Sequence, residues 1–151
     1  MIKVGCCGYP TSMKKYHEKF SLVELNRTFY EYPQMAMVMG WREKAPTDFE
    51  FTVKAHQDIS HKFRFEAEPS LKAFEQMKQI CKVLRARILL IQTPGSFRPD
   101  RLNAAEKFFR EMNRLELVIV WETRGAAWNT SDARRKLART LAELNVSHVP
   151  D

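Results

Sequence analysis

Two carboxylates in this sequence stand where a side chain can do chemistry. Glu24 lies in "VELNRTFYEYP", which begins as an apolar run, and Glu122 ends the run "LVIVWE". A buried polar group without a partner costs about 1–3 kcal/mol, so each carboxylate needs a partner or a purpose. Two carboxylates on one face can act as acid and base or hold a divalent ion. The structural alternative is that each pairs with a nearby cation, for example Glu122 with Arg124 or Lys54.

Two basic residues stand at the end of a third apolar segment, "FEFTVKA". Lys54 alternates with Phe51 and Val53, so it faces away from the residues that pack on helices. There it can bind an anion, form an imine or neutralise the two glutamates, and we favour neutralisation. His56 falls on the same side if the strand continues, where it can carry protons near neutral pH or close a hydrogen-bond network. His61 lies in the following loop and receives less weight.

Further side chains near these segments can contact a ligand. Asn26 and Gln92 offer neutral hydrogen bonds, and Arg124 offers a fork for phosphate or carboxylate. Tyr30 and Trp128 offer stacking surfaces, although aromatic residues more often belong to a core. No Ser/His/Asp motif, phosphate-binding glycine loop or zinc spacing is found, so we name no metal ligands, and the cofactor stays open.

Hydrophobic periodicity predicts the elements that position these residues. Strands are expected at residues 2–7, 22–26, 49–55, 87–92, 117–122 and 145–149. Helices are expected at residues 12–20, 34–44, 70–84, 101–115 and 132–144, with Ser70 as an N-cap and Leu115 in the core. The stretch 56–69 reads as a polar connection whose length suggests function.

This alternation predicts βαβ units and a parallel sheet. The segment "GCCGYP" does not match the glycine pattern of a doubly wound dinucleotide fold. Polar residues instead follow many strands, as at the carboxyl end of a (β/α)₈ barrel. They are Glu24, Asn26, Lys54, His56, Gln92, Glu122 and Arg124, with His148 and Asp151 at the end of the chain. We predict one α/β domain over residues 1–151, a TIM-barrel-like fold that is incomplete, with about six strands.

Five motifs in order resemble those of the YecE-like family, domain of unknown function seventy-two. They are "VELNRTFYEYP", Trp41, "FEFTVKAHQDISH", "ILLIQTPGSF" and "WETRGAAW". The resemblance implies a TIM-barrel-like fold and leaves the activity open. One departure is that Cys7 stands where the family's first strand usually has a serine, so a thiol replaces a hydroxyl. The other is length, since such barrels typically have roughly 250 residues; this chain is a truncated or split form, or partner chains complete it.

The formal charge of +7 lies mostly in the second half of the chain. Lys and Arg outnumber Asp and Glu by 11 to 10 in residues 1–75, and by 14 to 8 in residues 76–151. The excess forms stripes on two predicted helices, one of Lys78, Lys82 and Arg85 and one of Lys107, Arg110 and Arg114. Such stripes bind nucleic-acid phosphates in some proteins, but they are more often solvated helix faces.

The sequence carries no sign of a membrane or secretory protein. No window approaches the roughly 18 apolar residues of a membrane span, and the start of the chain lacks the apolar core of a signal peptide. The three cysteines make a poor disulfide framework. We therefore expect a cytoplasmic protein with reduced thiols.

Two functions fit these residues. The first is an enzyme of hydrolase or lyase type that acts on a polar or phosphorylated small molecule. Glu24, Glu122 and His56 would transfer protons, while Lys54 and Arg124 would bind negative charge. The alternative is a non-catalytic protein that binds nucleic acid through its basic outer helices.

The short sheet also predicts self-association. An unclosed barrel has two edge strands with unpaired backbone groups, and such edges favour association. We expect a homo-oligomer, most simply a two-fold dimer that covers the open edge. Size-exclusion chromatography with light scattering should give twice the mass of one 17.7 kDa chain. A monomer at micromolar concentration would contradict this expectation.

Overall fold

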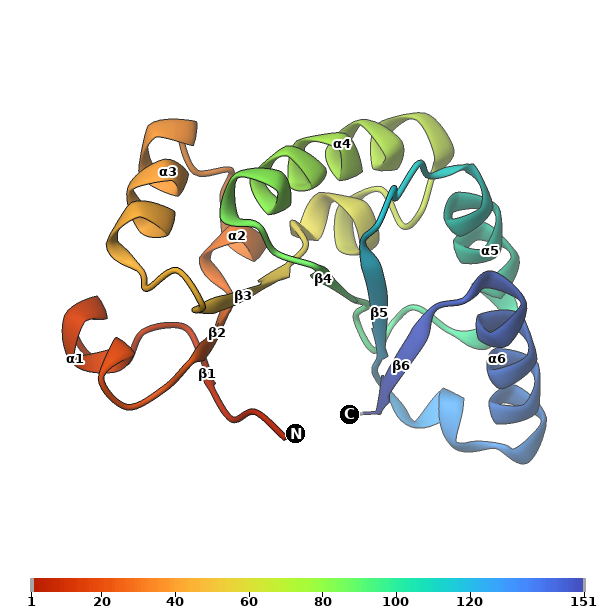
Figure 1. Cartoon of the computed structure of the whole chain (residues 1–151). Helices are drawn as coiled ribbons and strands as arrows, with labels where there is room; N and C mark the ends of the chain where they lie inside the picture. The colour runs from red at the N-terminus through yellow and green to blue at the C-terminus, as the bar shows by residue number, and fades with distance from the viewer. Residues whose placement is uncertain (1, 151) are drawn as a thin grey trace.

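Six parallel strands form one sheet whose spatial order is the order of the sequence (Figure 1). The computed structural model describes residues 2–150. The strands are β1 (Cys6–Cys7), β2 (Leu22–Leu25), β3 (Glu50–Lys54), β4 (Ile88–Gln92), β5 (Val118–Thr123) and β6 (Ser147–Pro150). The α-helices are α1 (Met13–His17), α2 (Arg27–Tyr30), α3 (Met35–Lys44), α4 (Ala67–Leu84), α5 (Leu102–Glu111) and α6 (Ser131–Leu144). Among the described residues, β1 and β6 each pair on one side only, so the sheet has two edges.

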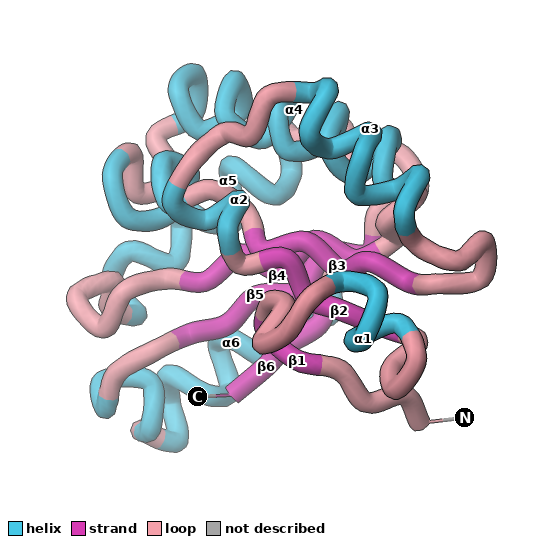
Figure 2. The backbone as a smooth tube through the Cα atoms, turned by 90° about the vertical axis from the view of Figure 1, so that its left-hand side faces the viewer, coloured by secondary structure: helices cyan, strands magenta, loops and turns pink. Residues whose placement is uncertain are grey.

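The sheet curves with its helices on the outer side, as a partial TIM barrel does (Figure 1). The helices α3 and α4 lie side by side over the strands in both views (Figure 2). Alternate strand residues such as Val53, Leu89 and Ile119 point toward these helices and are buried. The intervening residues, Lys54 and Gln92 among them, therefore point to the inner face. The predicted α/β fold is confirmed. No helix within residues 2–150 is both long and apolar enough to cross a membrane.

The predicted starts of the first strand and of the fourth helix are wrong. The first strand covers only Cys6–Cys7 instead of residues 2–7, because β1 pairs with β2 alone and Ile2 and Val4 extend into solvent. The fourth helix begins at Ala67, so Ser70 is not its N-cap. Ser70 lies inside the helix, where its buried hydroxyl donates to the carbonyl of Ile59 at 3.3 Å.

The polar connection of residues 56–69 contains regular structure that its polar composition does not predict. A π-helix, η1, covers Asp58–Lys62, and Phe65 follows with a left-handed φ of 64°. Phe65 is buried and contacts Phe97, Phe108, Phe109 and Trp121, with ring centroids 5.2 to 5.8 Å apart. Two apolar residues among polar neighbours, Ile59 and Phe65, thus anchor the segment in the core.

The helix α5 ends at Glu111, four residues before its predicted end. A short 3₁₀ turn, η2 (Pro99–Arg101), leads into it. Leu115 follows the helix with a φ of 52° and is 70% exposed, so its assignment to the core is wrong. The buried stripe of α5 stops at Met112, and Leu115 lies in the turn toward β5.

Buried hydroxyl groups bind carbonyls at or next to the carboxyl ends of four strands. The Thr28 hydroxyl shares its one hydrogen between the carbonyl oxygens of Leu25, at 2.8 Å, and Lys54, at 2.7 Å, at the ends of β2 and β3. The Ser60 hydroxyl donates to the Gln92 carbonyl at 2.5 Å, at the end of β4. Thr93 binds the Glu122 carbonyl through its hydroxyl at 3.1 Å and its backbone N–H at 2.9 Å. These bonds hold the carboxyl ends of the strands and the loops that follow them.

Replacing Thr28 with valine should show how much one such hydroxyl stabilises the fold. Valine keeps the shape but leaves two strand-end carbonyls without their donor, which should lower the free energy of unfolding by about 1–3 kcal/mol. Urea unfolding followed by circular dichroism measures the loss. Thr140→Val, at a half-buried position of α6, is the matched control and should change stability by less than about 0.5 kcal/mol. Equal effects of the two substitutions would show that the Thr28 hydroxyl contributes nothing.

Candidate functional site

Polar side chains of the inner face meet at the carboxyl ends of the strands, which we call the rim. Glu24 on β2 lies opposite Cys7 of β1 and interacts electrostatically with Lys54 of β3 and Glu122 of β5. Burial raises the pKa of Glu24, while the Cys7 thiol and the charge of Lys54 lower it and the charge of Glu122 raises it. Burial is the largest cause, so the net shift is upward. Side chains from four strands therefore share one environment.

Cys7 occupies the rim as a protonated thiol. Burial raises its pKa, and the charge and hydrogen bond of Glu24 raise it further, while Lys54 and a hydrogen bond with Asn26 lower it. Because a thiolate is the reactive form, this thiol is a poor nucleophile. It acts instead as a hydrogen-bond partner of Glu24, which a hydroxyl in the same place could also be.

Glu122 is held by Arg124. The Arg124 Nε donates to Glu122 Oε1 at 2.6 Å, a short charge-assisted hydrogen bond. The Glu122 side chain is only 12% exposed, whereas that of Arg124 is 43% exposed. The guanidinium therefore covers the carboxylate and keeps part of its own surface toward solvent.

Lys54 lies against an aromatic ring as well as near the glutamates. Its Nζ is 4.9 Å from the ring centroid of Phe29, on α2. A cation over an aromatic face is stabilised by about 0.5–2 kcal/mol, depending on its exposure. The ring of Phe29 thus fixes the direction in which Lys54 enters the rim.

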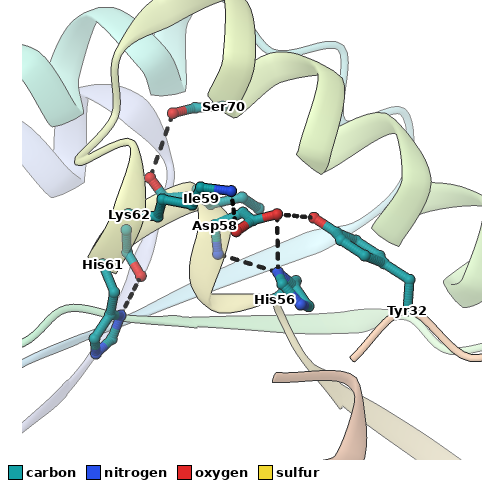
Figure 3. Close-up of polar contacts among 8 residues, drawn as sticks. Tyr32, His56, Asp58, Ile59, His61, Lys62 and Ser70 are labelled. Carbon is teal, nitrogen blue, oxygen red and sulfur yellow. Dashed lines mark hydrogen bonds and ion pairs between the residues drawn. The ribbon is translucent and has the colours of Figure 1, made fainter. Parts of the chain in front are cut away.

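His56 does not join this group. β3 ends at Lys54, and the chain turns into η1, so the two-residue alternation does not continue to His56. The buried His56 ring stacks on Tyr32 with centroids 3.9 Å apart, and its Nδ1 accepts the backbone N–H of Asp58 at 3.1 Å (Figure 3). Burial lowers the pKa of His56; the charge of Asp58 and a backbone hydrogen bond at Tyr30 oppose this shift. The expectation that His56 shares the side of Lys54 is therefore wrong.

His61 occupies the place expected for His56. It projects from η1 in a different direction from His56 (Figure 3), and its ring packs edge-on against Phe29, with centroids 5.0 Å apart. Burial lowers the pKa of His61, and the positive charges of Lys54 and Arg124 lower it further. Sequence reasoning gave His61 little weight because it falls in a polar connection. The sequence signal for His61 was Ile59, two residues before it: an apolar residue within the polar connection indicates that this part of the segment packs on the core.

Two amide oxygens at the rim lack donors. Within the described part of the chain, Asn26 Oδ1 and Gln92 Oε1 are buried and accept no hydrogen bond. Gln92 is only 6% exposed and lies beside Glu122 in the register of β4 and β5. Buried acceptors are normally satisfied, so these two oxygens are suited to a ligand that carries hydrogen-bond donors.

The predicted aromatic surfaces differ from each other. Tyr30 is 71% exposed and packs edge-on against Phe29, so one face of its ring is open. Trp128, in the 3₁₀ turn η3 (Ala126–Asn129), is 4% exposed, and its indole N–H donates to the Phe97 carbonyl at 3.0 Å. Trp128 packs on Trp121 and belongs to the core, so it does not present a stacking surface.

Little else from the chain end reaches the rim. His148 contacts the Thr123 hydroxyl at 2.9 Å, and Asp151 lies outside the described residues. Within residues 2–150, no group of three or more His, Cys, Asp or Glu side chains is arranged to hold a metal ion.

The basic stripes on the outer helices are largely paired. Lys78 contacts Glu75 at 2.6 Å and donates to the Asn113 carbonyl at 3.0 Å. Arg110 contacts Glu106 at 2.8 Å, and Arg114 donates to the Asn145 carbonyl at 2.8 Å. Lys107 lies 3.9 Å from Glu111. These cations are engaged within the protein, which weighs against a phosphate-binding face.

Comparisons with known proteins give the family and the fold. A family model described as "Protein of unknown function DUF72" matches residues 7–150. UPF0759 protein YecE of Escherichia coli K12 is 31% identical over 98 residues, which are 65% of this chain and 36% of that protein, and the same figures hold for YecE of Escherichia coli O157:H7.

Crystal structures of a DUF72 family protein from Enterococcus faecalis V583 share the fold. One has a TM-score of 0.75 at 22% identity and covers 98% of this chain and 61% of that chain. The other has a TM-score of 0.77 at 18% identity and covers 98% and 60%. This chain therefore spans less than two thirds of the length of the relatives that it matches.

The upward shift of the Glu24 pKa predicts a pH-dependent effect of Glu24→Gln. A raised pKa means that folding favours the neutral carboxyl, so stability falls as pH rises from the ordinary value of 4.5 through the folded-state pKa. Glutamine resembles the neutral form. The variant should therefore be more stable than the wild type at pH 7, and the difference should vanish below pH 4.5.

Urea unfolding between pH 4 and pH 8 measures this difference. Glu116→Gln, at an exposed glutamate in the turn before β5, should show no such dependence. A Glu24→Gln protein that is less stable than the wild type at pH 7 would mean that attraction to Lys54 outweighs burial.

Proposed function

This chain belongs to the DUF72 family, a family of unknown function, and we propose that it is an enzyme of hydrolase or lyase type. It acts on a polar, anionic small molecule at the carboxyl ends of the strands. The observation that carries this proposal is the pair of carboxyl groups, Glu24 and Glu122, which share the rim in two different environments.

The two environments suit two roles. Burial favours the neutral form of Glu24, so this carboxyl can give a proton. Glu122 accepts a charge-assisted hydrogen bond from Arg124 at 2.6 Å, which favours its charged form as a proton acceptor or an electrostatic partner. A carboxyl that can give a proton beside a carboxylate that can hold one is a usual arrangement for acid and base catalysis.

The cations can bind a negatively charged group of the substrate. Lys54, supported by the ring of Phe29, and Arg124, partly open to solvent, approach the rim from two sides. A guanidinium binds a carboxylate or phosphate in a planar fork, whereas an ammonium acts as a point charge. Both stabilise charge that develops during proton transfer.

The neutral amide groups can accept hydrogen bonds from hydroxyl or amide hydrogens of the substrate. Asn26 Oδ1 and Gln92 Oε1 are buried and accept no hydrogen bond within the described residues. A site with unsatisfied acceptors selects strongly for a ligand that carries donors, because a ligand without them leaves the acceptors buried and unpaired. We therefore expect a hydroxylated anionic substrate, with Tyr30 at the mouth of the site.

Loss of turnover in two glutamine variants tests this proposal. We would incubate the protein with hydroxy acids, sugar phosphates and chromogenic esters and glycosides, and follow product by NMR and absorbance. Glu24→Gln and Glu122→Gln should each lower kcat by about 100-fold or more, as expected for loss of general acid–base catalysis.

Charge reversal on the outer surface is the control. Lys82→Glu/Arg85→Glu, at exposed positions on and after α4, should leave turnover unchanged. Full activity in both glutamine variants would contradict the proposal. Salt-dependent binding of duplex DNA that disappears on charge reversal would favour the nucleic-acid alternative instead.

A further inference from the structure

We propose that His61 is a further proton-accepting residue of the rim, beside Glu122, and that Ser60 holds it with its Nε2 lone pair available. This inference rests on the proposed function of the rim and adds to it a residue and a defined tautomer. It follows from hydrogen bonds that can run in one direction only.

The Ser60 hydroxyl determines the tautomer of His61. Its oxygen lies 2.5 Å from the Gln92 carbonyl and 2.9 Å from His61 Nδ1. A carbonyl oxygen can only accept, so the single hydroxyl hydrogen of Ser60 points to Gln92. The oxygen then offers only lone pairs to His61, and Nδ1 must carry the hydrogen. In the neutral imidazole, Nε2 is therefore without a hydrogen and can accept one.

The π-helix η1 holds this pair firmly. Ser60 and the neighbouring Ile59 are buried, and the Ser70 hydroxyl binds the Ile59 carbonyl at 3.3 Å. At the start of the same turn, the Tyr32 hydroxyl donates to Asp58 Oδ2 at 3.1 Å (Figure 3). A π-helical turn is rare and is frequently found at functional sites. Here it places Ser60 against the sheet and His61 over the rim.

The charges around His61 favour its neutral form. Burial lowers its pKa, and the charges of Lys54 on β3 and Arg124 after β5 lower it further. The carboxyl groups of Glu24 and Glu122 lie beside the same two cations. His61 is therefore a free base at neutral pH, surrounded by groups that stabilise a negative substrate atom.

The proposed step conserves protons and electrons. A substrate hydroxyl gives its proton to His61 Nε2, so an O–H bond breaks and an N–H bond forms. The electron pair stays on the substrate oxygen, whose negative charge is stabilised by Lys54 and Arg124. Nδ1–H continues to donate to Ser60 in the imidazolium.

His56 provides the natural comparison within the same segment. Its Nδ1 already accepts the Asp58 backbone N–H at 3.1 Å, and Tyr32 covers its ring at 3.9 Å. It is thus a buried histidine with a structural role. His56 is therefore the control residue in experiments that measure whether Nε2 of His61 is available.

Long-range proton–nitrogen NMR tests the tautomer without a substrate. At pH 7.5 we expect His61 to carry its hydrogen on Nδ1, with a bare Nε2, and to titrate below the ordinary pKa of 6.5. His61→Gln identifies the signal, and His56→Gln should leave it unchanged. Ser60→Ala should convert it to a mixture of tautomers, while Ser60→Thr, which keeps the hydroxyl, should preserve it. A His61 signal protonated on Nε2 in the wild type overturns the proposal.

Diethyl pyrocarbonate, which attacks an unprotonated imidazole nitrogen, tests whether Nε2 of His61 is available to react. Mass spectrometry should show His61 modified at least 10-fold faster than His56, with a rate that falls as pH drops through the His61 pKa. Equal rates overturn the proposal. Neither experiment depends on Glu24 or Glu122, so full turnover in the glutamate variants would disprove the roles of those carboxyl groups and leave the result for His61 standing.

Discussion

The carbonyl groups at the ends of parallel strands constrain this structure most. Where a strand ends beneath a loop, its last carbonyl still needs a donor, since an unsatisfied buried group costs about 1–3 kcal/mol. Thr28, Ser60 and Thr93 supply these donors from the segments that follow β2, β3 and β4. Each bond ties the segment after a strand to the sheet, and all three hydroxyls reach the next strand. The loops that carry the functional side chains are thereby as fixed as the sheet.

One of these bonds joins folding to chemistry. The hydroxyl of Ser60 donates its hydrogen to the carbonyl of Gln92, the last residue of β4. Because that hydrogen is used, the Ser60 oxygen has only lone pairs to offer His61. The tautomer of the histidine is thus a consequence of strand termination. Close approach of two backbone segments also restricts the residue at position 125. Gly125 has a φ of 99°, and an added Cβ would lie 2.9 Å from the Gly95 carbonyl oxygen. The loops after β4 and β5 touch there, which explains the glycine at position 125 in "TRGAAW".

Strand periodicity made much of the rim predictable. Glu24, Lys54 and Gln92 occupy the face opposite buried residues such as Val53, and a period of two places them there whatever the loops do. His56 was misplaced because the alternation was extended beyond the end of β3, where the chain enters a π-helix that has no sequence signature. Trp128 was misplaced because a tryptophan after a strand can face a ligand or the core, and only the contact with Trp121 decides between them. Hydrogen-bond direction, on which His61 depends, requires coordinates.

The two ends of the sheet differ in a way that packing alone does not explain. At the amino ends, Ile88 and Val118 are partly exposed to solvent, and Glu50 forms an ion pair with Lys3. At the carboxyl ends, a half-buried carboxyl with a raised pKa, two buried amide oxygens without donors and a histidine beside two cations occupy one rim. A merely structural rim would be more stable with apolar or fully paired side chains in these places. Unfavourable groups that collect at one end of a sheet, and come from separate strands, are the physical mark of a site that a ligand completes.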